Sequence, residues 1–377
     1  MTKKVLVTGG AGFIGSHLVD MLIEQKGHEV SIIDTLEEQV HGKGDNPPDY
    51  LNKNANFLRG SVTEYKKLED LVIENDVVFH LAAIVGVGQS MYQIKRYIDN
   101  NIIGLANLLD ILVNSSHNVK KVVIASSNTI YGESKSHCKT CGVIFPELRS
   151  LEQLKRKDWE INCPKCGSKV KPLLSDENSR TNPSSIYAFS KLAQEKMGLM
   201  IGKTYGINTT ILRFFLVYGK RQALSNPYTG VCGIFITRTL YGNPPIIFED
   251  GNQSRDFVNI KDVCQALILG MDKNAANGEI FNVGTGISTT IREVAEIITE
   301  KINPKLKPVY DQQFRIGDIR HSVADISKIK RRLGYSPTLT FKEGIIDLID
   351  WIKAQKDDIQ NPSQKAMQEL KEKGLLK

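Results

Sequence analysis

The 377-residue sequence contains no unbroken apolar run of the roughly 18 to 20 residues that a membrane-spanning helix requires. It also lacks a dense block of basic residues, although 49 lysines and arginines outnumber 42 acidic residues and give a net charge of +7. Because these cations are spread along the chain, we expect no nucleic-acid partner, and at most a bias toward anionic small molecules. Internal repeats and low-complexity tracts are absent as well. These absences leave an ordinary globular protein.

The N-terminus has a basic start followed by a short apolar stretch that ends at Gly9-Gly10. This stretch is too short for a secretory signal peptide and runs directly into glycines. We therefore interpret it as a first β-strand and expect a cytoplasmic location, with no membrane partner.

Short apolar runs alternate with segments of helical periodicity, which is typical of a parallel sheet covered by helices. Strands are predicted at Val5–Thr8, Glu29–Asp34, Asn56–Gly60, Asp76–Ala83, Lys121–Ser127, Thr209–Tyr218 and Glu279–Val283. Helices are predicted at Ile14–Lys26, Asn101–Asn114, Ile291–Ile302 and Lys342–Lys353. The predicted fold class is α/β, a Rossmann-type doubly wound parallel sheet with a smaller C-terminal lobe.

A glycine-rich loop, Gly9-Gly10-Ala11-Gly12-Phe13-Ile14-Gly15, follows the first strand and opens a helix. Such glycines allow a tight turn and a close approach of backbone amides to a pyrophosphate, and the helix N-terminus attracts the phosphates. Asp34 ends the second strand, where a carboxylate accepts the hydroxyls of an adenosine ribose and repels a 2′-phosphate. The glycine-rich loop and Asp34 together predict NAD rather than NADP as the cofactor. The alternative for Asp34 is an incidental surface aspartate.

Tyr187 and Lys191 are four residues apart and therefore share one face of a helix. A free phenol is a poor base at neutral pH, and a neighbouring ammonium stabilises the phenolate and lowers its pKa. Ser127 ends the fifth strand at the edge of the sheet where ligands bind in such folds. We interpret it as a contact to a substrate hydroxyl, with a helix cap as the alternative.

Taken with further motifs, these residues resemble the extended short-chain dehydrogenase/reductase family over nearly the whole chain. The motifs are the Gly9–Gly15 loop, Asp34, His80-Leu81-Ala82-Ala83, Asn101 with Gly104, Ser126-Ser127, Tyr131-Gly132, Tyr187 with Lys191, Leu212-Arg213-Phe214, Arg255-Asp256-Phe257-Val258, and Arg315 with Gly317-Asp318.

The resemblance implies that Tyr187 takes a proton from a sugar hydroxyl while NAD takes the hydride, and that Lys191 holds the nicotinamide ribose. It implies catalytic roles for Ser127, Tyr187 and Lys191. Implied cofactor contacts are Gly9, Gly12, Phe13, Ile14, Gly15, Asp34, Ser61, Leu81, Ala82, Ala83, Asn101, Ser126, Tyr187 and Lys191. Implied substrate contacts are Val87, Gln89, Ser90, Asn128, Thr129, Arg221, Arg255, Arg315 and Asp318, with Arg255 and Arg315 gripping the diphosphate.

Family members that eliminate water carry an Asp-Glu pair after the catalytic serine, whereas this chain has Asn128 and Thr129. The sequence therefore favours an epimerase that oxidises a nucleotide-diphosphate sugar to a ketone and returns the hydride to the other face. An oxidoreductase that releases the ketone, or a non-catalytic NAD-binding regulator, are the alternatives. Two departures from the family pattern are Leu216, in place of an asparagine that contacts substrate phosphates, and Ser61, in place of an aspartate that meets adenine.

Within the family, three segments resemble the dTDP-L-rhamnose 4-epimerases. They are Gln39-Val40-His41-Gly42, residues 85–92 and residues 219–228. By analogy the product would be dTDP-6-deoxy-L-talose.

Two cysteine pairs, Cys138/Cys141 and Cys163/Cys166, are separated by 21 residues and each is followed by glycine. Paired knuckles of this kind form a tetrahedral thiolate site, which predicts structural Zn²⁺; disulfides are the alternative. The insert separates Ser127 from Tyr187 by 60 residues and therefore emerges beside the site. It could form a lid or wall over the sugar, or a docking surface.

The predicted domains follow from these motifs. Residues 1–137, 175–220 and 255–285 form the NAD-binding domain, and 138–174 form the zinc-ribbon insertion. Residues 221–254 and 286–356 form the substrate lobe, and 357–377 a charged tail. The resemblance implies a homodimer formed through helices that include Asn101–Val113 and the Tyr187 helix.

Overall fold

Seven parallel strands form the central sheet of the computed structural model, which describes residues 2–224, 230–355 and 362–377. In spatial order they are β14 (Glu279–Val283), β9 (Asn208–Phe214), β5 (Lys121–Ser127), β4 (Val77–His80), β1 (Lys4–Thr8), β2 (Glu29–Asp34) and β3 (Asn56–Arg59). The predicted doubly wound parallel sheet is confirmed.

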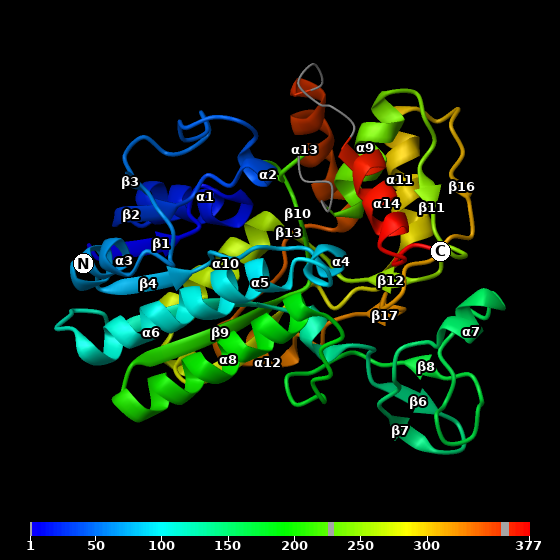
Figure 1. Cartoon of the computed structure of the whole chain (residues 1–377), viewed down its shortest axis with the longest axis horizontal. Coiled ribbons are helices and arrows are strands. Elements are labelled where there is room, and N and C mark those ends of the chain that lie inside the picture. Colours follow the sequence, from blue (N-terminus) through cyan, green and yellow to red (C-terminus); the bar gives the residue numbers. More distant parts are fainter. Residues whose placement is uncertain (1, 225–229, 356–361) are drawn as a thin grey trace.

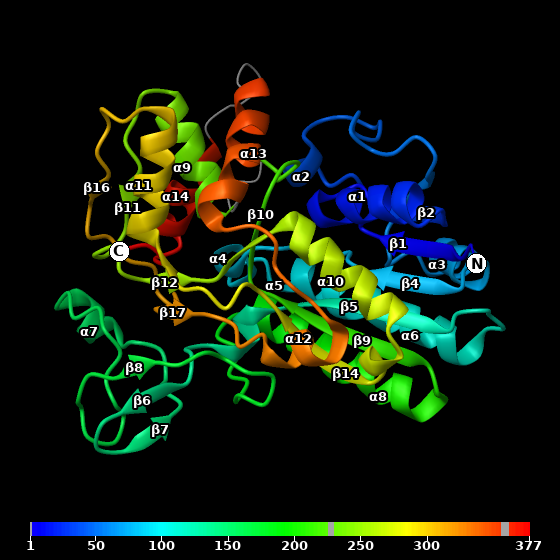
Figure 2. The ribbon, with the colours of Figure 1, turned by 180° about the vertical axis from the view of Figure 1, so that it is seen from behind.

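Helices cover both faces of this sheet, as Figures 1 and 2 show from opposite sides. On one face lie α1 (Phe13–Asp20), α10 (Ile260–Asp272) and α12 (Ser327–Leu333), and on the other α3 (Tyr65–Ile73), α6 (Gly104–Asn114) and α8 (Ile186–Tyr205). Each set of helices shares a buried apolar cluster with the strands, which explains why the strands are continuously apolar rather than alternating.

The prediction of one continuous strand at Thr209–Tyr218 is wrong, because this segment forms two strands. Residues 209–218 form β9 in the central sheet and a separate β10 (Leu216–Tyr218), which pairs with β13 (Phe257–Asn259). The break falls at Phe215: its amide donates to Val283 beside the sheet, and the next amide, of Leu216, donates to Asp256. The chain thereby leaves the sheet and enters the second lobe.

Two predicted helices and one strand also differ from expectation in their bounds. The first helix continues as a π-helical turn, η1 (Met21–Gln25), and α6 is preceded by another, η2 (Ile98–Ile103). The strand predicted to reach Ala83 ends at His80, so the backbone from Leu81 onward is free to line a cavity. Short remaining elements are α2 (Glu38–His41), α4 (Val87–Ser90), α5 (Ile94–Tyr97), η3 (Asn128–Tyr131) and η4 (Asn274–Ala276).

The second lobe packs α9 (Val231–Leu240), α11 (Ile291–Ile302) and α13 (Phe341–Ala354) around its own apolar core. Small sheets join it: β11 (Ile246–Ile247) with β16 (Val309–Tyr310), and β15 (Thr289–Thr290), β12 (Ser254–Arg255) and β17 (His321–Ser322). Helices α11 and α13 match the predicted positions closely because each begins at a capping box, Thr290 with Glu293 and Thr340 with Glu343. In the segment assigned to the substrate lobe, α12 instead packs beside β14.

The cysteine insert forms a separate three-stranded sheet, β7 (Gly142–Ile144), β6 (Ser136–Cys138) and β8 (Lys171–Pro172), with a short helix α7 (Leu151–Lys155). It projects from the edge of the sheet and lies below the second lobe, next to β17 (Figures 1 and 2). The predicted tail contains a further helix, α14 (Pro362–Glu372), beside the second lobe. Positions 225–228 of the loop motif and 357–361 of the tail lie outside the described residues.

Of the helices in the described ranges, none combines the length and apolarity needed to cross a membrane. The predicted dimer helices expose several apolar side chains, among them Ile103 on η2 and Phe189 and Met200 on α8. Dimerisation through this surface stays a prediction.

Candidate active site

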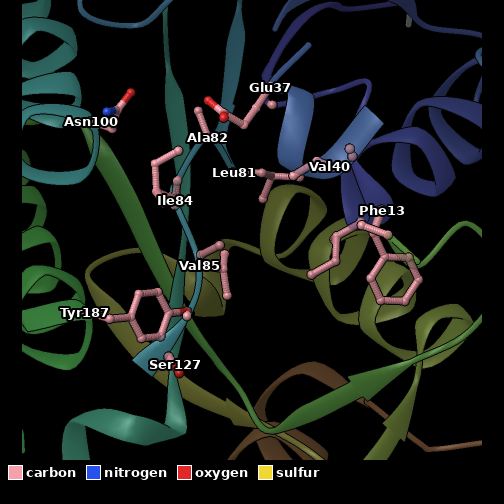
Figure 3. A pocket seen from close by; sticks show the side chains of 18 of the residues that line it. Phe13, Glu37, Val40, Leu81, Ala82, Ile84, Val85, Asn100, Ser127 and Tyr187 are labelled. Atoms are coloured by element: carbon pink, nitrogen blue, oxygen red, sulfur yellow. The ribbon is translucent and has the colours of Figure 1, made fainter. Parts of the chain in front are cut away.

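A cavity of about 490 Å³ opens at the carboxyl edge of the central strands. This is the edge where doubly wound folds bind their ligands. Its wall contains most of the predicted cofactor contacts: Gly9, Gly12, Phe13, Ile14, Gly15, Asp34, Ser61, Leu81, Ala82, Ala83 and Ser126. Figure 3 shows Phe13, Leu81 and Ala82 at one end of the cavity and Ser127 and Tyr187 at the other.

At Gly9 and Gly15 the glycine loop leaves no space for a side chain. A β-carbon on Gly9, which has φ +71°, would lie 2.9 Å from Ala82, and one on Gly15 would lie 2.3 Å from the Gly9 carbonyl oxygen. Bare backbone therefore faces the cavity at the start of α1, where the first amides of a helix attract anions. This cradle fits the pyrophosphate of a dinucleotide.

Asp34 ties the glycine loop to β2. One carboxylate oxygen accepts from the Ala11 amide at 3.0 Å and the other from the Leu36 amide at 3.0 Å. A carboxylate has about four lone-pair positions, so both oxygens keep capacity for ribose hydroxyls. At the neighbouring strand, Ser61 lines the cavity while its amide donates to Glu64.

Tyr187 and Ser127 both line the cavity and lie near one another at the same end of it (Figure 3). The phenol is only 8% exposed and packs edge-on against Tyr97. Burial raises the Tyr187 pKa to about 12, and the polar Ser127 side chain nearby opposes this rise. Ser127 accepts from the amide of Thr129, so the alternative interpretation, a helix cap, is observed, and the contact to a substrate hydroxyl stays a prediction.

Lys191 lies behind this pair rather than in the cavity wall. Its ammonium donates to the Ala125 carbonyl at 2.9 Å and to the Gln194 amide oxygen at 3.0 Å, and burial lowers its pKa to about 8. Gln194 was not among the predicted site residues, although its position three residues after Lys191 on α8 places both side chains on one face of the helix.

Asn101 and Ser126 hold the surrounding backbone. The Asn101 side chain exchanges hydrogen bonds with both the amide and the carbonyl of Ile84 and donates to Ser190, so it fixes the cavity loop after β4. The Ser126 hydroxyl donates to Glu195 at 2.5 Å, away from the cavity.

Carboxylates are absent from the catalytic end of the cavity, as far as the described lining residues go. Asp34, the last residue of β2, and Glu37, just after it, are the acidic side chains in that lining, and Figure 3 shows Glu37 at the opposite end from Ser127. Next to Ser127, Asn128 donates to Ser322 at 2.8 Å and Thr129 donates to Ser127 at 2.9 Å. Among the described lining residues, this end of the cavity therefore offers a phenol and hydroxyl groups.

The predicted substrate contacts fall into two groups. Val87, Asn128 and Thr129 line the cavity. Gln89 and Ser90 lie just behind it, where Gln89 accepts from the Tyr97 phenol and Ser90 donates to the Val87 carbonyl.

The predicted arginines do not line the cavity. Arg221 pairs with Asp20 at 2.7 Å and stacks over the Tyr50 ring. Arg255 donates to the carbonyls of Ile319 and Arg320 in the second lobe, and burial lowers the pKa of its guanidinium. Arg315 lies over the Phe248 ring, and Asp318 follows it in the same loop.

The four insert cysteines converge as predicted. Their sulfur atoms all lie within 4.8 Å of one another, and those of Cys138 and Cys166 are 3.5 Å apart, far beyond the S–S bond of about 2.05 Å in a disulfide. Both glycines after the pairs have φ +73°, as tight knuckle turns require. The cluster is therefore compatible with a tetrahedral thiolate site.

Family models and known proteins that resemble this chain are epimerases and dehydratases. The NAD dependent epimerase/dehydratase family matches residues 5–145, and the family described as GDP-mannose 4,6 dehydratase matches residues 167–348. The chain is 31% identical over 357 residues to a dTDP-L-rhamnose 4-epimerase of Burkholderia thailandensis, covering 94% of this chain and 96% of that protein.

Solved structures of 4-epimerases are also similar to this chain in sequence and fold. A UDP-glucose 4-epimerase from Thermotoga maritima with UDP-glucose is 31% identical, with a TM-score of 0.76 over 93% of this chain and 99% of that chain. A UDP-glucuronic acid 4-epimerase from Bacillus cereus, in complex with UDP-glucuronic acid and NAD, is 28% identical, with the same TM-score and coverage.

Proposed function

Since this chain belongs to the NAD-dependent epimerase/dehydratase family, we propose that it inverts C4 of the sugar in a nucleotide-diphosphate sugar. The observation that carries this proposal is the Ser127–Tyr187 pair, which faces the cavity without a neighbouring carboxylate. Such a site can move one proton at a carbinol oxygen but has no second acid or base for loss of water. The relatives named as 4-epimerases support C4 as the inverted carbon.

Tyr187 and Ser127 have different roles in the proposed reaction. Tyr187 accepts the proton of the sugar hydroxyl and later returns it, and Ser127 donates a hydrogen bond to the same oxygen. The glycine loop and Asp34 would hold NAD. When bound, NAD would supply a reversible acceptor for the hydride of that carbon. Near Tyr187 the wall is apolar, with Ile84 and Val85 (Figure 3), and these side chains offer no polar contact that would resist rotation of a sugar ketone.

Within this class, dTDP-L-rhamnose is the first substrate to test, with dTDP-6-deoxy-L-talose as the product. Its support is the relative from Burkholderia thailandensis and the three segments that resemble that group. The purified protein is offered dTDP-L-rhamnose and a set of UDP-sugars, and the products are identified by NMR. An epimerase inverts one carbon without consuming added NAD, whereas net reduction of added NAD would contradict the proposal.

Tyr187→Phe tests the catalytic assignment. We expect turnover to fall roughly 10²- to 10⁴-fold, since the phenol oxygen that moves the proton is removed. NAD affinity and the unfolding midpoint stay close to wild type. The matched control is Tyr205→Phe, the same change at an exposed tyrosine that ends the same helix. Equal turnover in Tyr187→Phe and the control would refute the assignment.

We also propose that the cysteine cluster holds one structural Zn²⁺. Four cysteine ligands fill a tetrahedral site, leaving no position for substrate, so the metal would stabilise the insert rather than take part in the reaction.

Cys163→Ser tests the metal, because Cys163 is a buried member of the cluster. We expect wild-type protein to carry about one zinc per chain by native mass spectrometry, and the variant to lose most of it. Cys232→Ser is the matched control, since Cys232 is equally buried but lies in α9. A metal-free wild type, or equal zinc content in all three proteins, would rule out the site.

A further inference from the structure

Several contacts between the insert and the second lobe fall on residues 312–321, a segment that carries two predicted substrate contacts, Arg315 and Asp318. The Trp159 ring packs against Phe314 with centroids 6.0 Å apart, and Lys157 donates to Gln312. From the start of the insert helix, Arg149 reaches the Asp318 carbonyl at 3.2 Å. The insert is therefore not a free appendage.

Arg320 is the centre of this contact and is fully buried. Its guanidinium binds three carboxylates: Glu249 at 2.8 Å, Asp250 at 2.8 Å, and Glu160 of the insert through Nε at 3.1 Å. Arg149 of the insert binds the same Glu249 carboxylate at 2.8 Å. A buried charge network of this kind is stable only when each member is paired, so removal of one partner disturbs the others.

The network reaches Arg255 through the backbone. The Arg255 guanidinium donates to the Ile319 carbonyl at 2.6 Å and to the Arg320 carbonyl at 3.0 Å. Glu160 also binds His321 at 3.2 Å, and the other ring nitrogen of His321 meets Ser254, the neighbour of Arg255, at 2.8 Å. The carbonyls that orient Arg255 thus belong to residues held by the insert.

We propose that Glu160 and Arg149 are positioning residues for nucleotide-sugar binding, which act by holding segment 312–321 and, through it, Arg255. The inference deepens the proposed function and rests on it, because Arg255 is taken to meet the substrate diphosphate. It assigns the insert as a support of segment 312–321 rather than a docking surface.

Glu160→Gln tests the proposal with little risk to folding, because the Glu160 side chain is 41% exposed and glutamine keeps its shape. We expect the affinity for dTDP and UDP, measured by calorimetry, to fall about tenfold through loss of charge-assisted bonds to Arg320 and His321. KM for the sugar nucleotide should rise in parallel, with kcat and NAD affinity nearly unchanged. Glu152→Gln, the same charge loss at an exposed position on α7, is the control and should match wild type.

A double variant distinguishes positioning from general destabilisation. If Glu160 acts through Arg255, Glu160→Gln should weaken dTDP binding much less in an Arg255→Lys background than in wild type. Unchanged dTDP and UDP affinity in Glu160→Gln, or fully additive effects, would overturn the inference while leaving epimerase turnover intact. A wild type that binds neither nucleotide would contradict both this inference and the proposed function.

Discussion

Lys191 is a buried cation whose two hydrogen bonds go to the Ala125 carbonyl and the Gln194 side chain. Burial, the largest influence, lowers its pKa from 10.5 to about 8, and the nearby Glu195 carboxylate opposes the change. The same burial raises the pKa of Tyr187, so the protein alone does not make this phenol acidic. Activation of Tyr187 is therefore expected in the loaded site, where a cationic cofactor ring adds the missing positive charge.

This shift predicts how Lys191 affects stability as pH changes. Between about pH 8 and 10.5 the unfolded lysine binds a proton that the folded one has released, so unfolding takes up protons and the wild type gains stability as pH rises. Relative to Lys191→Met, the free energy of unfolding should increase by up to about 3 kcal/mol across this window. Urea denaturation of both proteins without nucleotide, at pH 7 and pH 10, measures the difference. A constant difference would contradict the shifted pKa.

At the scale of elements, local signals predicted most of the fold. Strand β2, strand β5 and helix α11 have the predicted bounds, because apolar runs and a capping box mark their ends. Residues 209–218 were predicted to form one strand because their apolar pattern continues across Phe215. The strand breaks there because of tertiary hydrogen bonds to Val283 and Asp256. Periodicity cannot report bonds to backbone that is 40 or more residues away in sequence.

The candidate site also contains residues that local sequence signals predicted and residues that they did not. The glycine loop, Tyr187 and the cysteine pairs have fixed spacings, and all of them lie where the sequence placed them. Gln194 and Glu160 had no such signal. Glu160 meets Arg320 across 160 residues of sequence, and a single glutamate in an insert has no spacing that predicts this partner.

At the scale of the whole molecule, the C-terminal segment joins two loops that carry predicted substrate contacts. Around α4, Tyr92 donates to Glu369 and Lys373 lies over the Tyr92 ring. The last residues then pair with the second loop, where Phe314 and Lys377 exchange backbone hydrogen bonds. The charged tail predicted from the sequence is thus, in its described part, a strap across both lobes.

Leu376 anchors this strap, since its side chain is 3% exposed and it bridges to Arg315. Leu376→Ala removes buried apolar contacts worth about 2–3 kcal/mol, enough to populate a detached C-terminus. We expect faster proteolysis near residue 370 and a higher KM for the nucleotide sugar, because the 87–92 and 313–318 loops lose their common support. NAD affinity, measured separately, should change little, since the contacts given for the described part of the strap are to Tyr92, Phe314 and Arg315, away from the glycine loop. Leu375→Ala is the control, because Leu375 is only half-buried. Detachment of the C-terminus without a change in KM would show that the strap stabilises the lobes but does not position the substrate loops.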